Sequence, residues 1–306
     1  MAQAFNIQYL SHHEVDKTKW DRCIREADNG LIYGYSFYLD HMADHWDGLV
    51  LNDYEAIMPL TWNKKYGIHY LYQPFLCAQL GVFGKNIETK TSKSFLKEIP
   101  PKFKYWDISL NHHNILHLKD FNIVLRNNFV LKLSSSYDTL YKNYKENIQR
   151  NIKKAFQLGC VPQTNFPVEQ VIELSRQQMK SYSNQKHEFE RFRKLYYWLH
   201  QRNQAITYGI FSGAMELLSS CVFFFSNNRA YYVLVGNHPN GRTMGASHAL
   251  IDAFIKDHAG KNLALDFEGS DIRNLAFFYS SFGATDEKYP AVRLNNLPWY
   301  FKWAKK

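Results

Sequence analysis

The segment LALDFEGSDIRNLAFFYSSFG, residues 263–283, carries the two patterns that decide the fold. Residues 263–268 alternate between two faces, which predicts a strand with one buried face. The buried face comprises Leu263, Leu265 and Phe267, and the opposite face comprises Ala264, Asp266 and Glu268. Residues 272–282 contain neither glycine nor proline and precede Gly283, which predicts a helix that ends there. Two carboxylates therefore lie where a strand leads into a helix.

A similar pair of elements lies just upstream. Residues 230–235 are apolar or aromatic and predict a strand, and residues 245–258 predict a helix. The connection between them contains Gly241 and Gly245, which allow a backbone to approach a ligand closely. Because the N–H groups and the dipole of a helix N-terminus attract anions, we expect this connection to face an anionic group.

The predicted elements follow the same order in both halves of the chain: strand, helix, helix, hairpin, strand, helix and strand. Hairpins over 46–62 and 206–225 hold equivalent places in this order, although their sequences differ. A long helix predicted over 136–158 begins the second half. We therefore predict an α/β (α+β) protein with two tandem domains, residues 1–135 and 136–306. Each is expected to be a mixed, mostly antiparallel sheet flanked by helices.

The composition excludes a disordered or fibrous protein and restricts the classes of ligand that we expect. With 45% hydrophobic and 21% charged residues, the 306-residue chain is neither disordered nor fibrous. Residues 1–150 hold 18 basic and 16 acidic residues (+2), and residues 151–306 hold 19 and 12 (+7). The basic second half suits either a solvated surface or a polyanionic ligand such as coenzyme A, a nucleotide-linked sugar or tRNA.

Neither a membrane span nor a metal site is expected. No run of about 18 apolar residues occurs, and the N-terminus has no basic segment followed by an apolar one. We therefore expect a cytoplasmic protein whose four cysteines are free thiols. The histidine clusters lack a complete ligand set at zinc-site spacing, so no metal is predicted. These clusters are His12-His13 and His112-His113 with His117.

Three local sequences carry a family resemblance. Residues 274–283, NLAFFYSSFG, resemble the helix that closes many sites of GCN5-related N-acetyltransferases (GNAT). Residues 237–246, NHPNGRTMGA, lie where GNAT proteins carry a glycine-rich pyrophosphate loop. Residues 147–159, with DFEGS at 266–270, are similar to segments of FemAB-like proteins, which are tandem GNAT-like chains. The chain thus resembles a FemAB-like tandem GNAT protein, in its second half by motif and in its first half by element order.

The resemblance implies an N-acyltransferase that moves an acetyl or aminoacyl group from a thioester or aminoacyl donor to an amine. Residues 136–306 would hold the donor, and residues 1–135 would shape the acceptor cleft or support the fold. Acetyl-CoA or another acyl-CoA is one donor, and aminoacyl-tRNA is the other, as in FemAB relatives that act on cell-wall peptide precursors. The acceptor would be a small-molecule, peptide or sugar-nucleotide amine. A catalytically inactive GNAT-like binding protein, a nucleic-acid-binding module and the oligomeric state stay open.

Acyl transfer to an amine needs a base, a group that stabilises the oxyanion and an acid for the leaving group. Strand alternation makes Glu268 the candidate base, with Asp266 beside it. The resemblance implies that Tyr279 protonates the departing thiolate. The absence of lysine between residues 272 and 283 favours a thioester donor. Lys288 and Arg293 are expected to contact an anionic substrate. The predicted donor-binding residues are Val235, Gly236, Asn237, Gly241, Arg242, Met244, Gly245, Ala246, Ser247 and Asn274.

Overall fold

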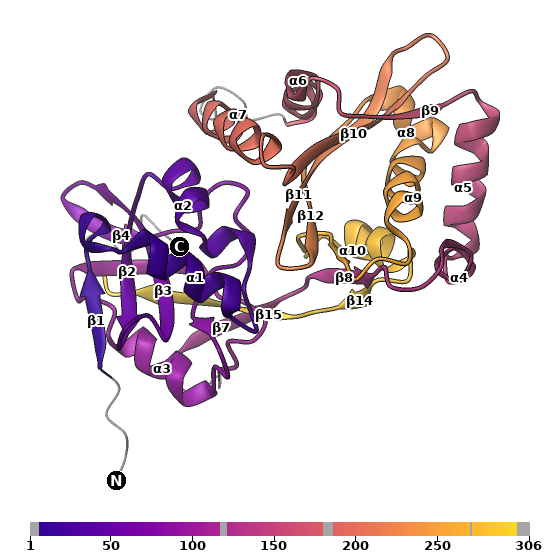
Figure 1. Ribbon diagram of the computed structural model, residues 1–306. Coiled ribbons are helices and arrows are strands. Elements are labelled where there is room, and N and C mark those ends of the chain that lie inside the picture. The colour runs from indigo at the N-terminus through magenta and orange to yellow at the C-terminus, as the bar shows by residue number, and fades with distance from the viewer. Residues whose placement is uncertain (1–5, 117–120, 180–185, 270, 299–306) are drawn as a thin grey trace. The chain divides into compact units, whose positions relative to one another are not determined.

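The computed structural model describes residues 6–116, 121–179, 186–269 and 271–298, which form two compact units (Figure 1). The first unit contains the residues up to Arg126 together with those from Lys288 onwards. The second unit runs from Asn127 to Glu287. The chain therefore leaves the first unit after Arg126 and returns to it near its C-terminus.

The first unit is built on an eight-stranded sheet with the order β1-β2-β3-β4-β6-β15-β7 and with β5 paired to β3. Of these neighbours only β4 and β6 are parallel in the described chain. The strands are β1 (Ile7–Leu10), β2 (His45–Leu51), β3 (Ala56–Lys65), β4 (Ile68–Leu71), β5 (Phe83–Gly84), β6 (Phe103–Ser109), β7 (Asn122–Arg126) and β15 (Tyr289–Asn295). The helices are α1 (Lys17–Glu26), α2 (Ser36–Met42) and α3 (Thr89–Lys97), with single turns η1 (His12–Glu14) and η2 (Ile32–Gly34).

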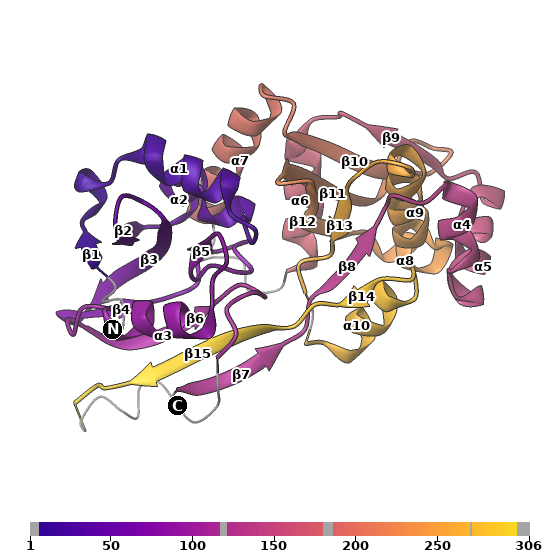
Figure 2. The ribbon, with the colours of Figure 1, turned by 60° about the horizontal axis from the view of Figure 1, so that its bottom comes forward.

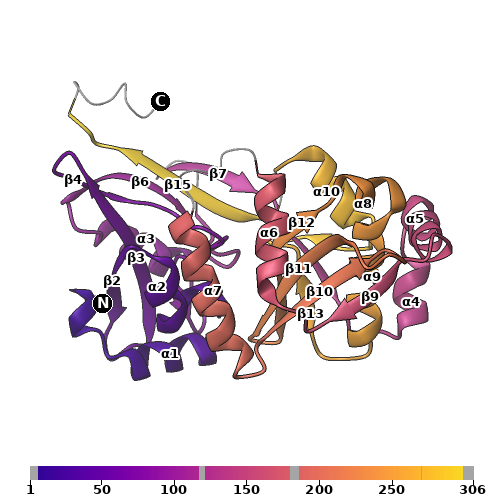
Figure 3. The same cartoon turned by 90° about the horizontal axis from the view of Figure 1, so that it is seen from above.

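The second unit has a seven-stranded sheet with the order β14-β8-β13-β12-β11-β10-β9, in which β12 and β13 are parallel. Figure 3 shows α6 on one face of this sheet and α9 on the other. The strands are β8 (Phe129–Lys132), β9 (Val161–Thr164), β10 (Ala205–Phe211), β11 (Leu217–Ser226), β12 (Arg229–Asn237), β13 (Ala264–Asp266) and β14 (Thr285–Asp286). The helices are α4 (Tyr137–Lys142), α5 (Glu146–Gln157), α6 (Val168–Gln178), α7 (Lys186–His200), α8 (Pro239–Met244), α9 (Ala246–His258) and α10 (Arg273–Ser280).

The two sheets repeat one plan, and this confirms the predicted fold class. In each, four antiparallel strands precede one parallel neighbour and then two further antiparallel strands. The sixth strand of each sheet comes from an unexpected part of the chain. β8 follows β7 directly but pairs in the second sheet, and β15 follows β14 but pairs between β6 and β7 in the first (Figure 2).

This exchange of strands corrects the predicted domain boundary. The predicted boundary at 135 places residues 129–133 in the first domain and residues 292–294 in the second. The structure instead divides the chain after Arg126 and again after Glu287. The reason is tertiary. Val292 is 1% exposed and pairs with Ile108 on one side and Ile123 on the other, so β15 fills a gap in the first sheet.

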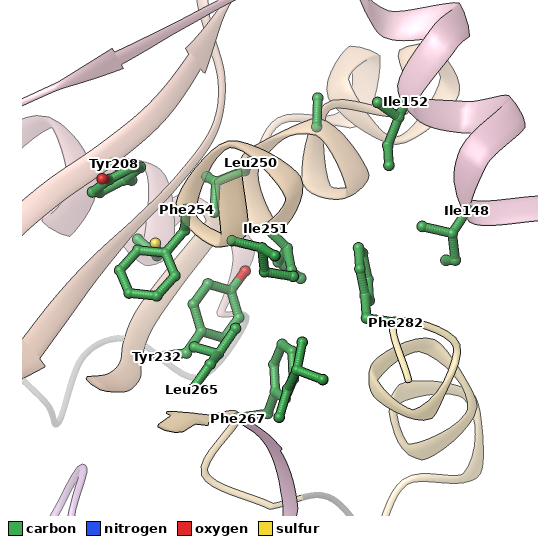
Figure 4. Packing of buried hydrophobic residues seen from close by; sticks show 14 of the residues in the cluster. Ile148, Ile152, Tyr208, Tyr232, Leu250, Ile251, Phe254, Leu265, Phe267 and Phe282 are labelled. Carbon is green, nitrogen blue, oxygen red and sulfur yellow. The ribbon is translucent and has the colours of Figure 1, made fainter. Parts of the chain in front are cut away.

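A continuous apolar core lies between the second sheet and its helices (Figure 4). Ile148 and Ile152 project into it from α5, and Leu265 and Phe267 confirm the predicted buried face of residues 263–267. The hairpin of β11 and β12 turns through two asparagines with positive φ, as a two-residue connection requires.

The prediction of a single helix over 136–158 is wrong, because this segment forms two helices, α4 and α5. Tyr144, between the two helices, is buried with its ring 5.2 Å from that of Phe282. The backbone N–H of Lys145 donates to the carbonyl of Ser281 (2.9 Å). These contacts with the segment after α10 replace the helical hydrogen bonds at the break.

Candidate active site at the end of strand β12

Strand β12 is irregular near its end. Two of its residues, Leu234 and Val235, face the single residue Cys221 of β11, which makes a β-bulge. Leu234 has a φ of 45°, a left-handed conformation that a leucine rarely adopts. A bulge leaves backbone groups outside the regular ladder and is common beside active sites. The backbone at Leu234 and Val235 is therefore a source of N–H donors at a fixed position.

Strands β12 and β13 also diverge at this point. Their parallel pairing ends at Tyr231 and Asp266, whereas β12 continues to Asn237. The chain turns away after β13, where Glu268 has a φ of 60°. Within the described ranges, residues 232–237 of β12 consequently have no partner in β13.

Polar side chains gather around Asn237, the last residue of β12. Its Oδ1 accepts hydrogen bonds from Ser219 Oγ (2.7 Å) and Ser247 Oγ (2.6 Å), and its backbone N–H donates to Gln178 Oε1 (2.8 Å). Ser220 Oγ is buried, and no hydrogen-bond partner for it occurs in the described part of the chain. These groups form a polar wall from β11, α6 and the first turn of α9.

The glycines predicted to admit a ligand instead pack against the protein. A Cβ on Gly241 would lie 2.2 Å from the carbonyl oxygen of Leu218, and one on Gly245 would lie 2.5 Å from that of Asn151. At Gly236 the corresponding atom would lie 2.6 Å from the backbone of α6. Each of these positions therefore requires glycine, because neighbouring backbone of the second unit lies too close for a Cβ.

Residues 239–244 form the short helix α8, where the resemblance implies a glycine-rich loop. Pro239 occupies its first turn, the side chain of His238 accepts from the N–H of Asn240 (3.3 Å), and Gly245 ends it with a φ of 81°. Proline at a helix start and glycine at its end both favour such a helix. Residues 239–244 are therefore helical up to Gly245, where α9 begins.

Asp266 lies in a buried ion pair. It is 1% exposed, and it accepts hydrogen bonds from Arg229 Nη1 (2.6 Å) and from the backbone N–H of Glu268 (2.8 Å). Arg229 also donates to Glu287 (2.8 Å). Burial lowers the pKa of Arg229, but the two carboxylates outweigh it and raise that pKa. Asp266 is predicted as a second catalytic carboxylate, but its ion pair with Arg229 already explains why a charged residue is buried here.

Tyr279 is buried on α10, within range of the charge of Glu268. The Tyr279 ring stacks on Phe267 with centroids 4.6 Å apart, and the residue is 8% exposed. Burial raises the pKa of Tyr279, and the charge of Glu268 raises it further. The hydroxyl therefore keeps its proton at neutral pH. The argument from strand alternation was wrong for Glu268, because the strand ends at Asp266.

No family model matches the sequence, and no curated protein sequence matches it. Among solved structures, FemX is similar over 98% of this chain and 100% of its own, with a TM-score of 0.65 and 11% identity. A tandem GNAT protein from the clavulanic acid biosynthesis pathway is similar over 96% and 99%, with a TM-score of 0.56 and 10% identity. The C-terminal domain of a putative lysylphosphatidylglycerol synthetase from Agrobacterium fabrum is similar over 94% of each chain, with a TM-score of 0.53 and 8% identity.

The chain has a FemAB-like tandem GNAT fold. In this tandem GNAT fold, several predicted site residues lie elsewhere than at the end of β12. Asn274 is exposed on α10, and Arg242 is exposed on α8 beside Met244. Lys288 and Arg293 belong to the first unit, where Arg293 Nη2 donates to Asp107 Oδ2 (3.0 Å). Ala246, in contrast, is buried at the start of α9, next to Ser247 of the polar wall.

His248 was not predicted from the sequence. It lies in the first turns of α9 with its ring 4.9 Å from and nearly perpendicular to that of Phe278 on α10. Burial lowers its pKa to about 4, so the imidazole is neutral at neutral pH. The sequence signal for His248 is a polar residue within the mostly apolar segment ASHALIDAF. The corresponding signal for Ser220 is the pair Ser219-Ser220 within LLSSCVFFF.

The remaining predictions concern metals, cysteines and membranes. No group of three potential metal ligands occurs in the described residues, and His117 lies outside them. All four cysteines are buried free thiols, as predicted. None of the described helices is long and apolar enough to cross a membrane.

Proposed function

We propose that this chain is an N-acyltransferase, which transfers an acyl group from an activated donor to an amine. The observation that carries the proposal is the bulged, diverging end of β12. Backbone N–H groups fixed at such a bulge can stabilise the oxyanion that forms when an amine attacks an acyl carbonyl. The likeness of fold to a tandem GNAT protein supports the same class of reaction.

Glu268 and Tyr279 supply the two proton transfers in this proposal. Glu268 takes the proton that the attacking amine loses, directly or through water. Tyr279 gives a proton to the leaving group, and its raised pKa keeps that proton available. The polar wall around Asn237 and Ser220 orients the acyl group.

The donor is proposed to be an aminoacyl ester, as on aminoacyl-tRNA, with acyl-CoA as the second candidate. The close packing of Gly241 and Gly245 and the formation of α8 in place of a glycine-rich loop support this order of donors. The absence of lysine from residues 272–283 favours a thioester instead, so the donor needs a direct test. The acceptor is proposed to be a small-molecule, peptide or sugar-nucleotide amine.

Binding measurements distinguish these donors. Acetyl-CoA is titrated by calorimetry, and charged and deacylated tRNA are titrated by filter binding, into wild type and Arg242→Ala. We expect charged tRNA to bind more tightly than deacylated tRNA. Tight acetyl-CoA binding that Arg242→Ala weakens by about 1–3 kcal/mol would assign the thioester instead.

Two other outcomes count against an enzyme. Equal affinity for charged and deacylated tRNA, with a steep salt dependence, would indicate a nucleic-acid-binding module. Binding of neither donor would indicate a catalytically inactive protein with this fold.

A further inference from the structure

A cavity of about 750 Å³ lies at the β9 edge of the second sheet. Residues from α4 and α5 form one side, residues from α9 form another, and β9 and β10 contribute Pro162, Thr164 and Tyr208. Strand β11 separates β10 from β12, so this cavity is distinct from the candidate active site. Its volume falls in the range of about 300–1,000 Å³ that is usual for small-molecule sites.

Two of the hydroxyl hydrogens in the cavity wall, those of Tyr137 and Tyr208, are bonded to aspartates. Tyr137 Oη donates to the carboxylate of Asp252 (2.9 and 3.1 Å), and Tyr208 Oη donates to Asp257 Oδ2 (2.9 Å). A phenol has one hydrogen to donate, whereas a carboxylate has about four acceptor positions. The wall therefore keeps spare acceptors on Asp252 and Asp257, and Tyr137 and Tyr208 have no further hydrogen to donate to an anion.

The aromatic rings of the cavity suit the same chemistry. The rings of Tyr137 and Tyr141 lie 5.7 Å apart, and both residues line the cavity. Lys256 Nζ lies 5.8 Å from the Tyr137 centroid, so an ammonium of the protein already occupies cation–π distance from this ring. The lining contains three aspartates, Asp138, Asp252 and Asp257, against the two lysines Lys153 and Lys256.

We propose that this cavity binds a primary alkylammonium ligand of metabolite size. Its ammonium donates to Asp252 and Asp257, and its alkyl chain lies along the rings of Tyr137 and Tyr141. Asp252 is 3% exposed, so a charge that reaches it is largely removed from water and is attracted more strongly than at a surface. The inference rests on this cavity alone and does not require acyl transfer at β12.

The probe is 1,5-diaminopentane, titrated by calorimetry into the full-length protein. We expect saturable binding, and we expect no binding of the uncharged 1,5-pentanediol or of pentanoate. Asp257→Asn should weaken binding about tenfold, because a charge-assisted hydrogen bond is lost. Asp252→Asn should do the same, and its thermal melt shows whether it is folded. Since Asp257 is exposed, its variant keeps the test valid if Asp252→Asn unfolds.

Two further variants make the test specific. Lys256→Gln should tighten diamine binding several-fold, because it removes the ammonium that competes for the Tyr137 ring. Asp53→Asn, an exposed position in the first unit, removes the same charge outside the cavity and should change nothing. The proposal is overturned if wild type and Lys256→Gln show no saturable binding. It is also overturned if the diol binds equally or if Asp53→Asn weakens binding as much as Asp257→Asn.

Discussion

At the residue scale, the Tyr279 hydroxyl is the atom on which the proposed chemistry depends. Tyr279→Phe keeps the ring that stacks on Phe267 and removes only the proton donor. We expect turnover to fall by about 10²–10⁴, the range for lost general acid–base catalysis, with donor affinity unchanged. Steady-state kinetics across pH check this, with Tyr196→Phe, another buried tyrosine, as the control. A wild-type rate in Tyr279→Phe would make the tyrosine structural.

His248 makes a separate prediction about stability. In the folded chain it stays neutral down to pH about 4, whereas its usual pKa is 6.5. The unfolded chain therefore binds more protons in this interval, and stability is lost as pH falls from 6.5 towards 4. His248→Gln does not titrate, so its loss of unfolding free energy between pH 7 and 4.5 should be smaller by up to about 3 kcal/mol. Urea denaturation at both pH values measures this, and equal losses in the two proteins would contradict it.

At the scale of elements, the junction of α8 and α9 depends on Gly245. Gly245→Ala adds a Cβ that would lie 2.5 Å from Asn151 on α5, at a φ of 81°. Gly260→Ala has nearly the same φ, 79°, with open space around the new atom, so it isolates backbone strain. We expect Gly245→Ala to be the less stable of the two by about 1–3 kcal/mol, as overpacking predicts. Equal thermal midpoints would mean that the α8–α5 contact does not constrain this junction.

Elements of this chain could be predicted where local patterns decide them. The alternation in residues 263–267 and the hairpin residues of β2, β3, β10 and β11 identified strands that the structure confirms. The α4–α5 break and α8 could not be predicted as readily, because Tyr144 and Gly241 are placed by contacts with Phe282 and Leu218 that lie far along the chain. The ion pair of Asp266 was missed for the same reason, since Arg229 meets it only across paired strands.

At the scale of the whole molecule, the exchange of β8 and β15 makes a testable claim about which sheet β15 stabilises. Val292→Pro removes a ladder donor and should strongly destabilise a strand with neighbours on both sides, by about 3 kcal/mol or more. We expect amide hydrogen exchange to speed up in β6 and β7 while β10–β12 stay protected. Val161→Pro, in the edge strand β9, is the matched control. Faster exchange in β10–β12 instead would restore the domain division predicted at residue 135.

The central claim is acyl transfer at the end of β12, and transfer of label tests it most directly. Wild type and Glu268→Gln are incubated with tRNA that carries a ¹⁴C-labelled amino acid, or with ¹⁴C-acetyl-CoA, and a panel of amines. The panel holds amino acids, short peptides and amino-sugar nucleotides, and amide products are identified by mass spectrometry. We predict label in an amide with at least one donor, formed about 10²–10⁴ times more slowly by Glu268→Gln. No labelled amide from either donor, or equal rates in the two proteins, would contradict the assignment.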